Sequence, residues 1–123
     1  MAVAAADYAE QSTMDADDKW ARMSPDKRKN YVKRLRQTAM ELMVARATRQ
    51  GLQGKDIAKR TGYTPAWASN INNLSNQRFE ALAEFATAVG YPLSFFIAMA
   101  EDLIELEDEK QAAMDAKKGD EES

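Results

Sequence analysis

Residues 53–73 read Q-G-K-D-I-A-K-R-T-G-Y-T-P-A-W-A-S-N-I-N-N, and this stretch decides the fold. It predicts a short helix over residues 53–60, a stop at Gly62, and a second helix that Thr64 caps and Pro65 opens. Two short helices joined by so tight a turn are typical of a helix-turn-helix, whose second helix enters the major groove of DNA. The alternative is an ordinary helical hairpin inside a bundle, which is the more frequent arrangement.

The charge distribution favours the nucleic-acid interpretation. Residues 22–78 hold 13 lysines and arginines against three acids, which is a net charge of +10. Residues 1–21 carry a net charge of −4 and residues 79–123 carry −9, so the basic block lies between two acidic ends. Such a block is typical of a polyanion-binding module, although a well-solvated helix surface would also account for it.

The composition argues against several other functions. The 123 residues include no cysteine and no histidine, which removes disulfides, thiolate zinc sites and the commonest general base. No paired carboxylates stand in a pocket-forming context, so we expect no enzyme activity, no cofactor and no metal. No apolar run approaches the roughly 18 residues that a membrane span needs, and the N-terminus lacks a secretory signal. We therefore expect a soluble, cytoplasmic protein.

Helical periodicity continues on both sides of the central stretch. Ser24 and Pro25 start a long first helix that Gly51 stops, a fourth helix ends at Gly90, and Pro92 opens a fifth. No strand pattern survives, which predicts an all-α fold. The predicted inner faces comprise Tyr31, Val32, Leu35, Ala39, Leu42 and Met43 in the first helix, Phe79, Leu82, Ala83, Ala86 and Val89 in the fourth, and Leu93, Phe96, Ile97, Ala100 and Leu103 in the fifth.

Composition also divides the chain into three parts. Residues 1–23 form an acidic N-terminal segment, and residues 24–106 form the helix-turn-helix domain with its last helix. Residues 107–123 form a charged tail that is poor in large apolar groups, so we expect it to be disordered.

The central stretch resembles a known family. G-L-Q-G-K-D-I-A-K-R-T-G-Y-T-P-A-W-A-S-N-I-N-N at residues 51–73 is similar to the helix-turn-helix of lambda-repressor-like, Xre-type regulators, G-L-T-Q-x-x-L-A-x-x-x-G-[VY]-S-P-x-[YW]-[VL]-S-x-I-E-N-G. Residues 79–96 match the family's next segment, L-E-x-L-x-x-[IL]-A-x-A-L-G-[VY]-P-L-x-x-[LF]. The match covers about residues 35–97. It implies a compact five-helix lambda-repressor-like DNA-binding domain, here with an extended first helix and acidic tails.

The resemblance also implies roles for single positions on the second motif helix. Pro65 and Ala66 could offer bases only apolar contact, whereas Asn70 could make a bidentate contact to adenine. Gly54 stands where the family has a phosphate-binding glutamine, so Gln53 or Lys55 is expected to take over that contact. The positions that match the family's base-reading residues are Pro65, Ala66, Ser69 and Asn70.

Contacts to the DNA backbone are expected on both sides of that helix. Trp67 is expected to pack against Tyr63 and the flank of the groove, with a partly buried core tryptophan as the equal alternative. The predicted backbone contacts are Gln53, Lys55, Lys59, Arg60, Thr64, Trp67, Asn73 and Arg78, with Arg46 and Arg49 of the first helix as further candidates.

The last helix predicts self-association. Phe95, Met99 and Leu106 have no obvious internal partner, and an exposed apolar stripe commonly marks an interface. The alternative is a larger core roofed by the N-terminal segment, in which Trp20 and Met23 are the large apolar groups.

The expected function is therefore a sequence-specific transcriptional regulator that binds a palindromic operator as a homodimer and represses transcription. Its expected partner is double-stranded DNA in a bacterial or phage-infected cell, with a toxin or antirepressor as a further protein partner and no membrane. The alternative is the antitoxin of a toxin–antitoxin pair with an autoregulatory helix-turn-helix.

Overall fold

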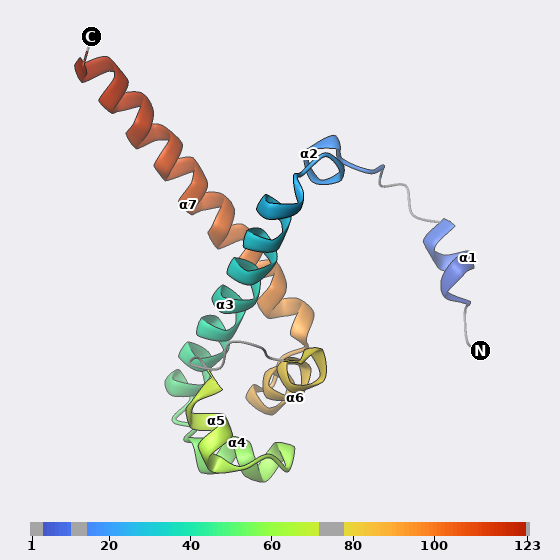
Figure 1. Ribbon diagram of the computed structural model, residues 1–123. Coiled ribbons are helices and arrows are strands. Elements are labelled where there is room, and N and C mark those ends of the chain that lie inside the picture. The colour runs from blue at the N-terminus through green and yellow to red at the C-terminus, as the bar shows by residue number, and fades with distance from the viewer. Residues whose placement is uncertain (1–3, 11–14, 72–77, 123) are drawn as a thin grey trace. The chain divides into compact units, whose positions relative to one another are not determined.

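The computed structural model describes residues 4–10, 15–71 and 78–122, and these residues form helices and no strand (Figure 1). The predicted all-α class is therefore confirmed. Two compact units divide the chain: residues 1–30, called the first unit below, and residues 31–123, called the second unit. The helices are α1 (Ala5–Glu10), α2 (Asp18–Ala21), α3 (Pro25–Arg49), α4 (Gly54–Thr61), α5 (Pro65–Ser69), α6 (Phe79–Val89) and α7 (Leu93–Glu122).

The first unit is organised by helix caps, and none of its described residues is buried. The Asp17 carboxylate accepts a hydrogen bond from a backbone N–H in the first turn of α2 at 2.9 Å. The Arg28 guanidinium donates to the carbonyl oxygens of Trp20, Ala21 and Met23 at 3.2 to 3.3 Å, which satisfies groups at the C-terminal end of α2. No residue of α1 or α2 is buried.

The second unit has a hydrophobic core to which α3, α4, α5, α6 and α7 all contribute. Within this unit α4 packs against α5 and α6, and α6 packs against α7. The chain bends by 99° between α6 and α7, so the two helices enclose the core from two directions. The contiguous core cluster consists of Ala39, Met40, Met43 and Ala47 of α3, Ile57 of α4, Ala68 and Ile71 in and after α5, Leu82, Phe85, Ala86, Ala88 and Val89 of α6, and Phe96 and Ala100 of α7.

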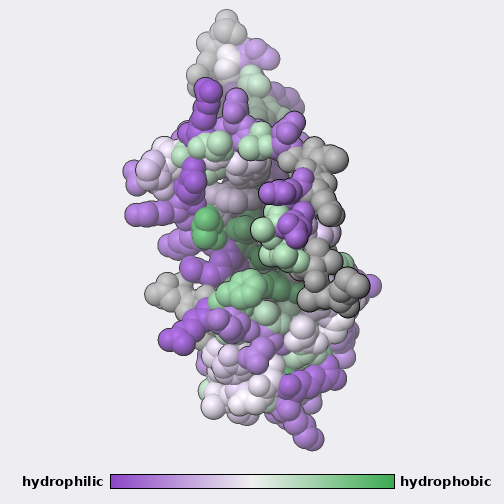
Figure 2. All heavy atoms as spheres, turned by 90° about the vertical axis from the view of Figure 1, so that its right-hand side faces the viewer, coloured by the Kyte–Doolittle hydropathy of each residue, from purple (hydrophilic) through white to green (hydrophobic). Residues whose placement is uncertain are grey.

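The inner faces predicted for α3 and α6 are wrong at Val32 and Phe79, which are 55% and 72% exposed. The buried part of α3 begins only at Thr38, about two turns beyond Tyr31, where the predicted inner face starts. Phe79 is the first residue of α6, where a side chain leans toward the helix N-terminus and away from the turns that meet the core. On the face that Figure 2 shows, apolar residues gather in the middle between hydrophilic ones.

The inner face predicted for α7 is wrong at its end. Leu103 is 37% exposed, whereas Ile104 is 3% exposed, because the inward line proceeds in steps of four from Phe96 through Ala100 to Ile104. No single helix among the described residues is long and apolar enough to cross a membrane.

The helix α7 also continues to Glu122, although we expected a disordered tail from residue 107. This segment is rich in alanine, glutamate, lysine and glutamine, which all favour helix. The Gln111 amide adds a hydrogen bond to the Asp115 carboxylate one turn later, at 3.0 Å. Low hydrophobicity alone therefore gave a wrong expectation for the structure of this segment.

Arg34 connects α3 to α7. The Arg34 guanidinium donates to Glu107 at 2.7 Å and to Asp108 at 2.8 Å. These hydrogen bonds to Asp108 and then Glu107 raise the pKa of Arg34, so its charge is permanent. The pair of contacts holds α7 against α3 just beyond the last buried side chain, Ile104.

Candidate nucleic-acid interface

Three local hydrogen bonds shape the turn between α4 and α5. Gly62 ends α4 in the left-handed conformation with φ of 83°, and its N–H donates to the Ala58 carbonyl. The Thr61 hydroxyl donates to the Ile57 carbonyl at 2.8 Å and accepts from the N–H of Tyr63 at 3.2 Å. The predicted stop at Gly62 is therefore confirmed, and the chain reverses within a few residues.

The second helix of the motif starts as the sequence predicts. The Thr64 hydroxyl accepts a hydrogen bond from the N–H of Trp67 at 3.1 Å, and Pro65 is the first helical residue. The helix is short, ending at Ser69, and Ala68 and Ile71 anchor it in the core. Its start is therefore fixed by capping and its end by burial.

The helices α4 and α5 approach most closely at Gly54. A side-chain carbon on Gly54 would overlap the hydroxyl of Ser69 and would lie 3.0 Å from the carbonyl oxygen of Pro65. One turn later in α4, the small side chain of Ala58 is buried as well. This crossing gives a physical reason for glycine where the resembling family has glutamine.

Aromatic side chains connect the turn to the core. The Trp67 ring stacks on Tyr63 at a centroid distance of 4.2 Å and meets Phe85 edge-on at 6.0 Å. The predicted packing of Trp67 against Tyr63 is confirmed. The alternative of a partly buried tryptophan also holds, since Trp67 is half-buried against the core. Its contact with DNA stays a prediction.

A carboxylate on α6 holds the turn from the other side. The Tyr63 hydroxyl donates a hydrogen bond to Glu84, and this bond is the largest cause that raises the pKa of Tyr63. The nearby Glu80 raises this pKa further, and Arg78 lowers it. The contact of Glu84 with Tyr63 was not predicted, because nothing in the sequence around Glu84 indicates a contact with a residue that precedes α5.

The predicted base-reading residues are exposed, but two of them already have local contacts. Pro65 and Ala66 lie open to solvent. The Asn70 amide donates a hydrogen bond to the Ala66 carbonyl at 2.9 Å and so helps to cap the end of α5. Ser69 is exposed overall, yet its hydroxyl occupies the space above Gly54. Specific readout by any of these residues stays a prediction.

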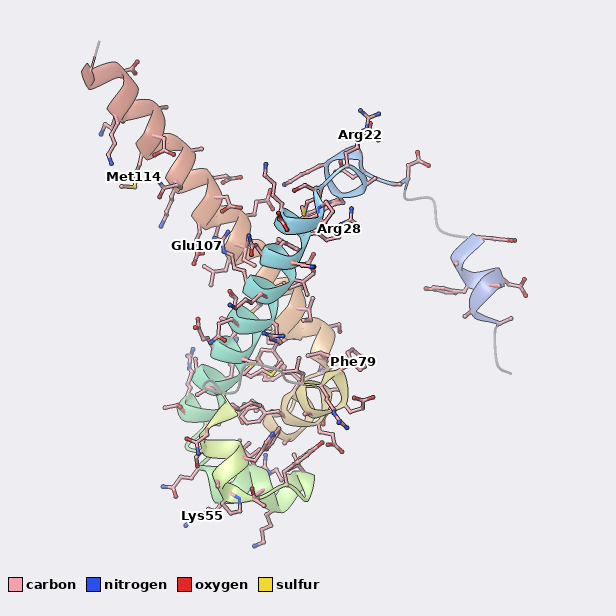
Figure 3. The ribbon with its side chains drawn as sticks, viewed as in Figure 1. Arg22, Arg28, Lys55, Phe79, Glu107 and Met114 are labelled. Atoms are coloured by element: carbon pink, nitrogen blue, oxygen red, sulfur yellow. The ribbon has the colours of Figure 1, made fainter. Side chains whose placement is uncertain are left out.

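The predicted backbone-contacting cations separate into two groups. Lys55 and Lys59 are exposed, and neither forms an ion pair within the described residues; Lys55 extends away from α4 in Figure 3. Arg60 instead donates to the Ala88 carbonyl at 2.6 Å near the end of α6. Arg46 lies over the rings of Tyr91 and Phe95, at 5.5 and 5.6 Å from their centroids.

Three of the remaining predicted positions lie at helix ends, and one lies outside the described residues. Gln53 is the N-cap of α4, and its backbone N–H donates to the Asp56 carboxylate at 2.8 Å. Arg78 is exposed at the start of α6, and Arg49 is exposed at the end of α3. Asn73 lies outside the described residues.

The predicted dimer residues are correct only in part. Phe95 and Met99 pack against the core of their own chain, so the expectation that they lack an internal partner is wrong. Phe95 stacks on Tyr91 at 4.4 Å and meets Phe96 edge-on at 5.3 Å. Leu106 is 53% exposed, in agreement with an unpartnered side chain.

Replacing Arg60 with alanine is expected to lower the free energy of unfolding by about 1–2 kcal/mol, since a charged donor to a partly buried carbonyl is lost. The matched control is Lys59→Ala, which removes the same charge from an exposed neighbour and should change stability by less than about 0.5 kcal/mol. Urea unfolding followed by circular dichroism measures both. Equal stabilities of the two variants would contradict a structural role for Arg60.

Among the described residues no group of histidine, cysteine or carboxylate side chains could hold a metal ion. The helices α4 and α5 offer a polar and cationic surface. Comparison with protein-family models, with curated proteins and with solved structures yields no match for this chain.

Proposed function

We propose that the chain is a sequence-specific DNA-binding regulator that occupies an operator through α4 and α5 and represses transcription. The observation that carries the proposal is the crossing at Gly54, which locks α5 onto α4 while Pro65, Ala66 and Asn70 stay exposed. The helix α5 contains no acid and no long aliphatic side chain, so its outer surface suits a groove lined by phosphates. A hairpin that only filled a bundle has no need of such a surface.

Affinity in this proposal comes mainly from charge. Lys55 and Lys59 lie on the same helix one turn apart and are available to phosphates. Each neutralised phosphate releases counterions, so binding weakens steeply as salt rises. Arg60 and Arg46 are left out of this set because their guanidinium groups already serve the fold.

Base recognition would rest on Asn70. An asparagine amide has two N–H donors and one carbonyl acceptor, and a single donor is used on Ala66. The other N–H and the carbonyl oxygen remain for the bidentate contact to adenine, while Pro65 and Ala66 suit a thymine methyl group. One such reader discriminates by only about 1–3 kcal/mol, so the proposed unit is a homodimer on a palindrome.

The finer fold assignment belongs to the same proposal. We assign α3 to α7 of the second unit to a lambda-repressor-like arrangement of five helices. The order of a long helix, two short crossing helices and two core helices supports this assignment.

The proposal is tested with a randomised DNA duplex library, from which the protein should select an inverted repeat. On the selected site, Asn70→Ala should weaken binding about tenfold and leave binding to random DNA nearly unchanged. The variant Lys55→Ala should weaken binding to both DNAs and reduce the salt slope by about 1. Fluorescence anisotropy over a salt series measures all three proteins.

Two results would count against the proposal. Failure to enrich any sequence would remove the regulator function. An equal loss on selected and random DNA for Asn70→Ala would remove the assignment of the reading face, and the loss of the Ala66 contact would then be its cause.

A further inference from the structure

Beyond Asp108, which the Arg34 guanidinium contacts, α7 has no packing partner among the described residues of the second unit. Ile104, 3% exposed, is the last buried side chain of the helix, and every described side chain from Glu105 to Asp120 is exposed. Beyond its contact with Arg34, α7 extends away from the other helices of the second unit (Figure 1). A helix of this length is only marginally stable in water without tertiary contacts. A partner along this segment would therefore stabilise it.

Apolar groups follow one face of this free segment. Leu103, Leu106 and Met114 are 37%, 53% and 57% exposed, and Met114 projects from the helix in Figure 3. Steps of three and four residues place them on one face, away from Ile104. We call this face the outer stripe: Leu103, Leu106, Lys110, Ala113, Met114 and Lys117.

The charges beside the outer stripe are unevenly distributed along the helix. Residues 101–109 hold six acids and no base, a net charge of −6. Residues 110–118 hold three lysines and one acid, a net charge of +2. A parallel pair of such helices would set −6 against −6, whereas an antiparallel pair centred on Asp108 sets residues 98–106, with a net charge of −3, against residues 110–118, with +2, in both halves. In the antiparallel pair only residues 107–109 face like charge.

We propose that the outer stripe binds the same stripe of a second copy of this chain, with the two α7 helices antiparallel. A register centred on Asp108 sets Leu103 of one copy beside Ala113 of the other and brings Lys117 within one turn of Asp102. A basic helix from another protein would satisfy the acids but would place like charges against Lys110 and Lys117, which lie within the stripe itself. The charge pattern therefore selects a second copy.

This inference deepens the proposed function, because it supplies the second DNA-reading unit that a palindrome requires. It also moves the interface away from Phe95 and Met99, which pack against their own core, and toward Leu103, Leu106 and Met114. The interface is isologous, so each substitution changes two side chains in every dimer.

Sedimentation without DNA tests the pairing, so its result does not depend on whether the chain binds an operator. The wild-type protein should be a dimer at about 10 µM. Leu106→Lys sets a lysine opposite Lys110 of the second copy and should raise the dimer dissociation constant about 50-fold with helical circular dichroism retained. The matched control is Ala112→Lys, which adds the same charge on a different, exposed face of α7 and should stay dimeric. A monomeric wild-type protein, or a Leu106→Lys variant as dimeric as the control, would overturn the pairing.

Cross-linking tests the direction of the helices. The chain has no cysteine, so Leu103→Cys and Ala113→Cys each introduce a unique thiol. When the two variants are mixed and oxidised, the antiparallel register predicts disulfides between position 103 and position 113. A parallel pair instead joins each position to itself, since ten residues separate the two sites by about 15 Å along a helix. Predominant 103–103 cross-links would overturn the antiparallel arrangement.

Discussion

Replacing Gly54 with glutamine should lower the free energy of unfolding by about 2–3 kcal/mol and weaken operator binding more than tenfold. The side chain would overlap the Ser69 hydroxyl and press on the Pro65 carbonyl oxygen, which lies 3.0 Å from the added carbon. Ser69 can rotate, but a backbone carbonyl in the first turn of α5 cannot move without tilting the helix. The better helix propensity of glutamine offsets less than about 1 kcal/mol of this cost.

The resemblance to lambda-repressor-like regulators leads to the opposite expectation for the same variant. That family places a phosphate-binding glutamine at this position, so Gly54→Gln would restore its pattern and tighten binding to DNA. The two expectations separate cleanly in urea unfolding and in anisotropy on the selected operator. Tighter binding at unchanged stability would show that α4 and α5 have room for the side chain and that their crossing is looser than described.

Two further variants identify the cause of the loss. Adding Ser69→Ala to Gly54→Gln should recover part of the stability, because the hydroxyl is removed while the Pro65 carbonyl remains. Gly119 on α7 has no atom within 4 Å of an added side-chain carbon, so Gly119→Gln should leave the unfolding free energy unchanged or slightly raised. A loss at Gly119 as large as that at Gly54 would contradict the explanation by crossing.

Capping chemistry explains why several helix ends could be predicted from the sequence. Gly62 and Gly90 end α4 and α6 with φ of 83° and 104°, a conformation that other residues rarely adopt. Thr64 and Pro65 start α5, and the Thr64 hydroxyl caps it as expected. These signals depend only on residues within one turn, so a single sequence contains them in full.

Positions that depend on helix packing could not be predicted in the same way. Phe79 and Leu103 fit the helical period, yet the core contacts later turns of α6 and a different register of α7. The length of α7 was missed because its composition suits both a solvated tail and a partnered helix. Periodicity identifies a helix but not the portion of it that another helix covers.

In the candidate interface, too, local features could be predicted and long-range contacts could not. The exposure of Lys55 and Lys59 agrees with a surface role that charge and spacing already suggested. Arg60 looks equivalent to Lys59 in the sequence, but it reaches the Ala88 carbonyl on α6, which lies far away along the chain. A cation that serves the fold and one available to phosphate differ only in such long-range contacts.

Phe95 packs against the core and is not part of the proposed interface. Its replacement by alanine should therefore lower the free energy of unfolding by about 2–3 kcal/mol. The ring stacks on Tyr91 at 4.4 Å, meets Phe96 at 5.3 Å and lies below the Arg46 guanidinium, so all three lose a partner. The fully buried Phe96 should lose more as alanine, about 3–5 kcal/mol, whereas Leu106→Ala should barely change the unfolding of the monomer. Urea unfolding at concentrations below dimerisation orders the three variants. If Leu106→Ala destabilised the monomer as much as Phe95→Ala, the outer stripe would belong to the core, and α7 would have no free face left for a second copy.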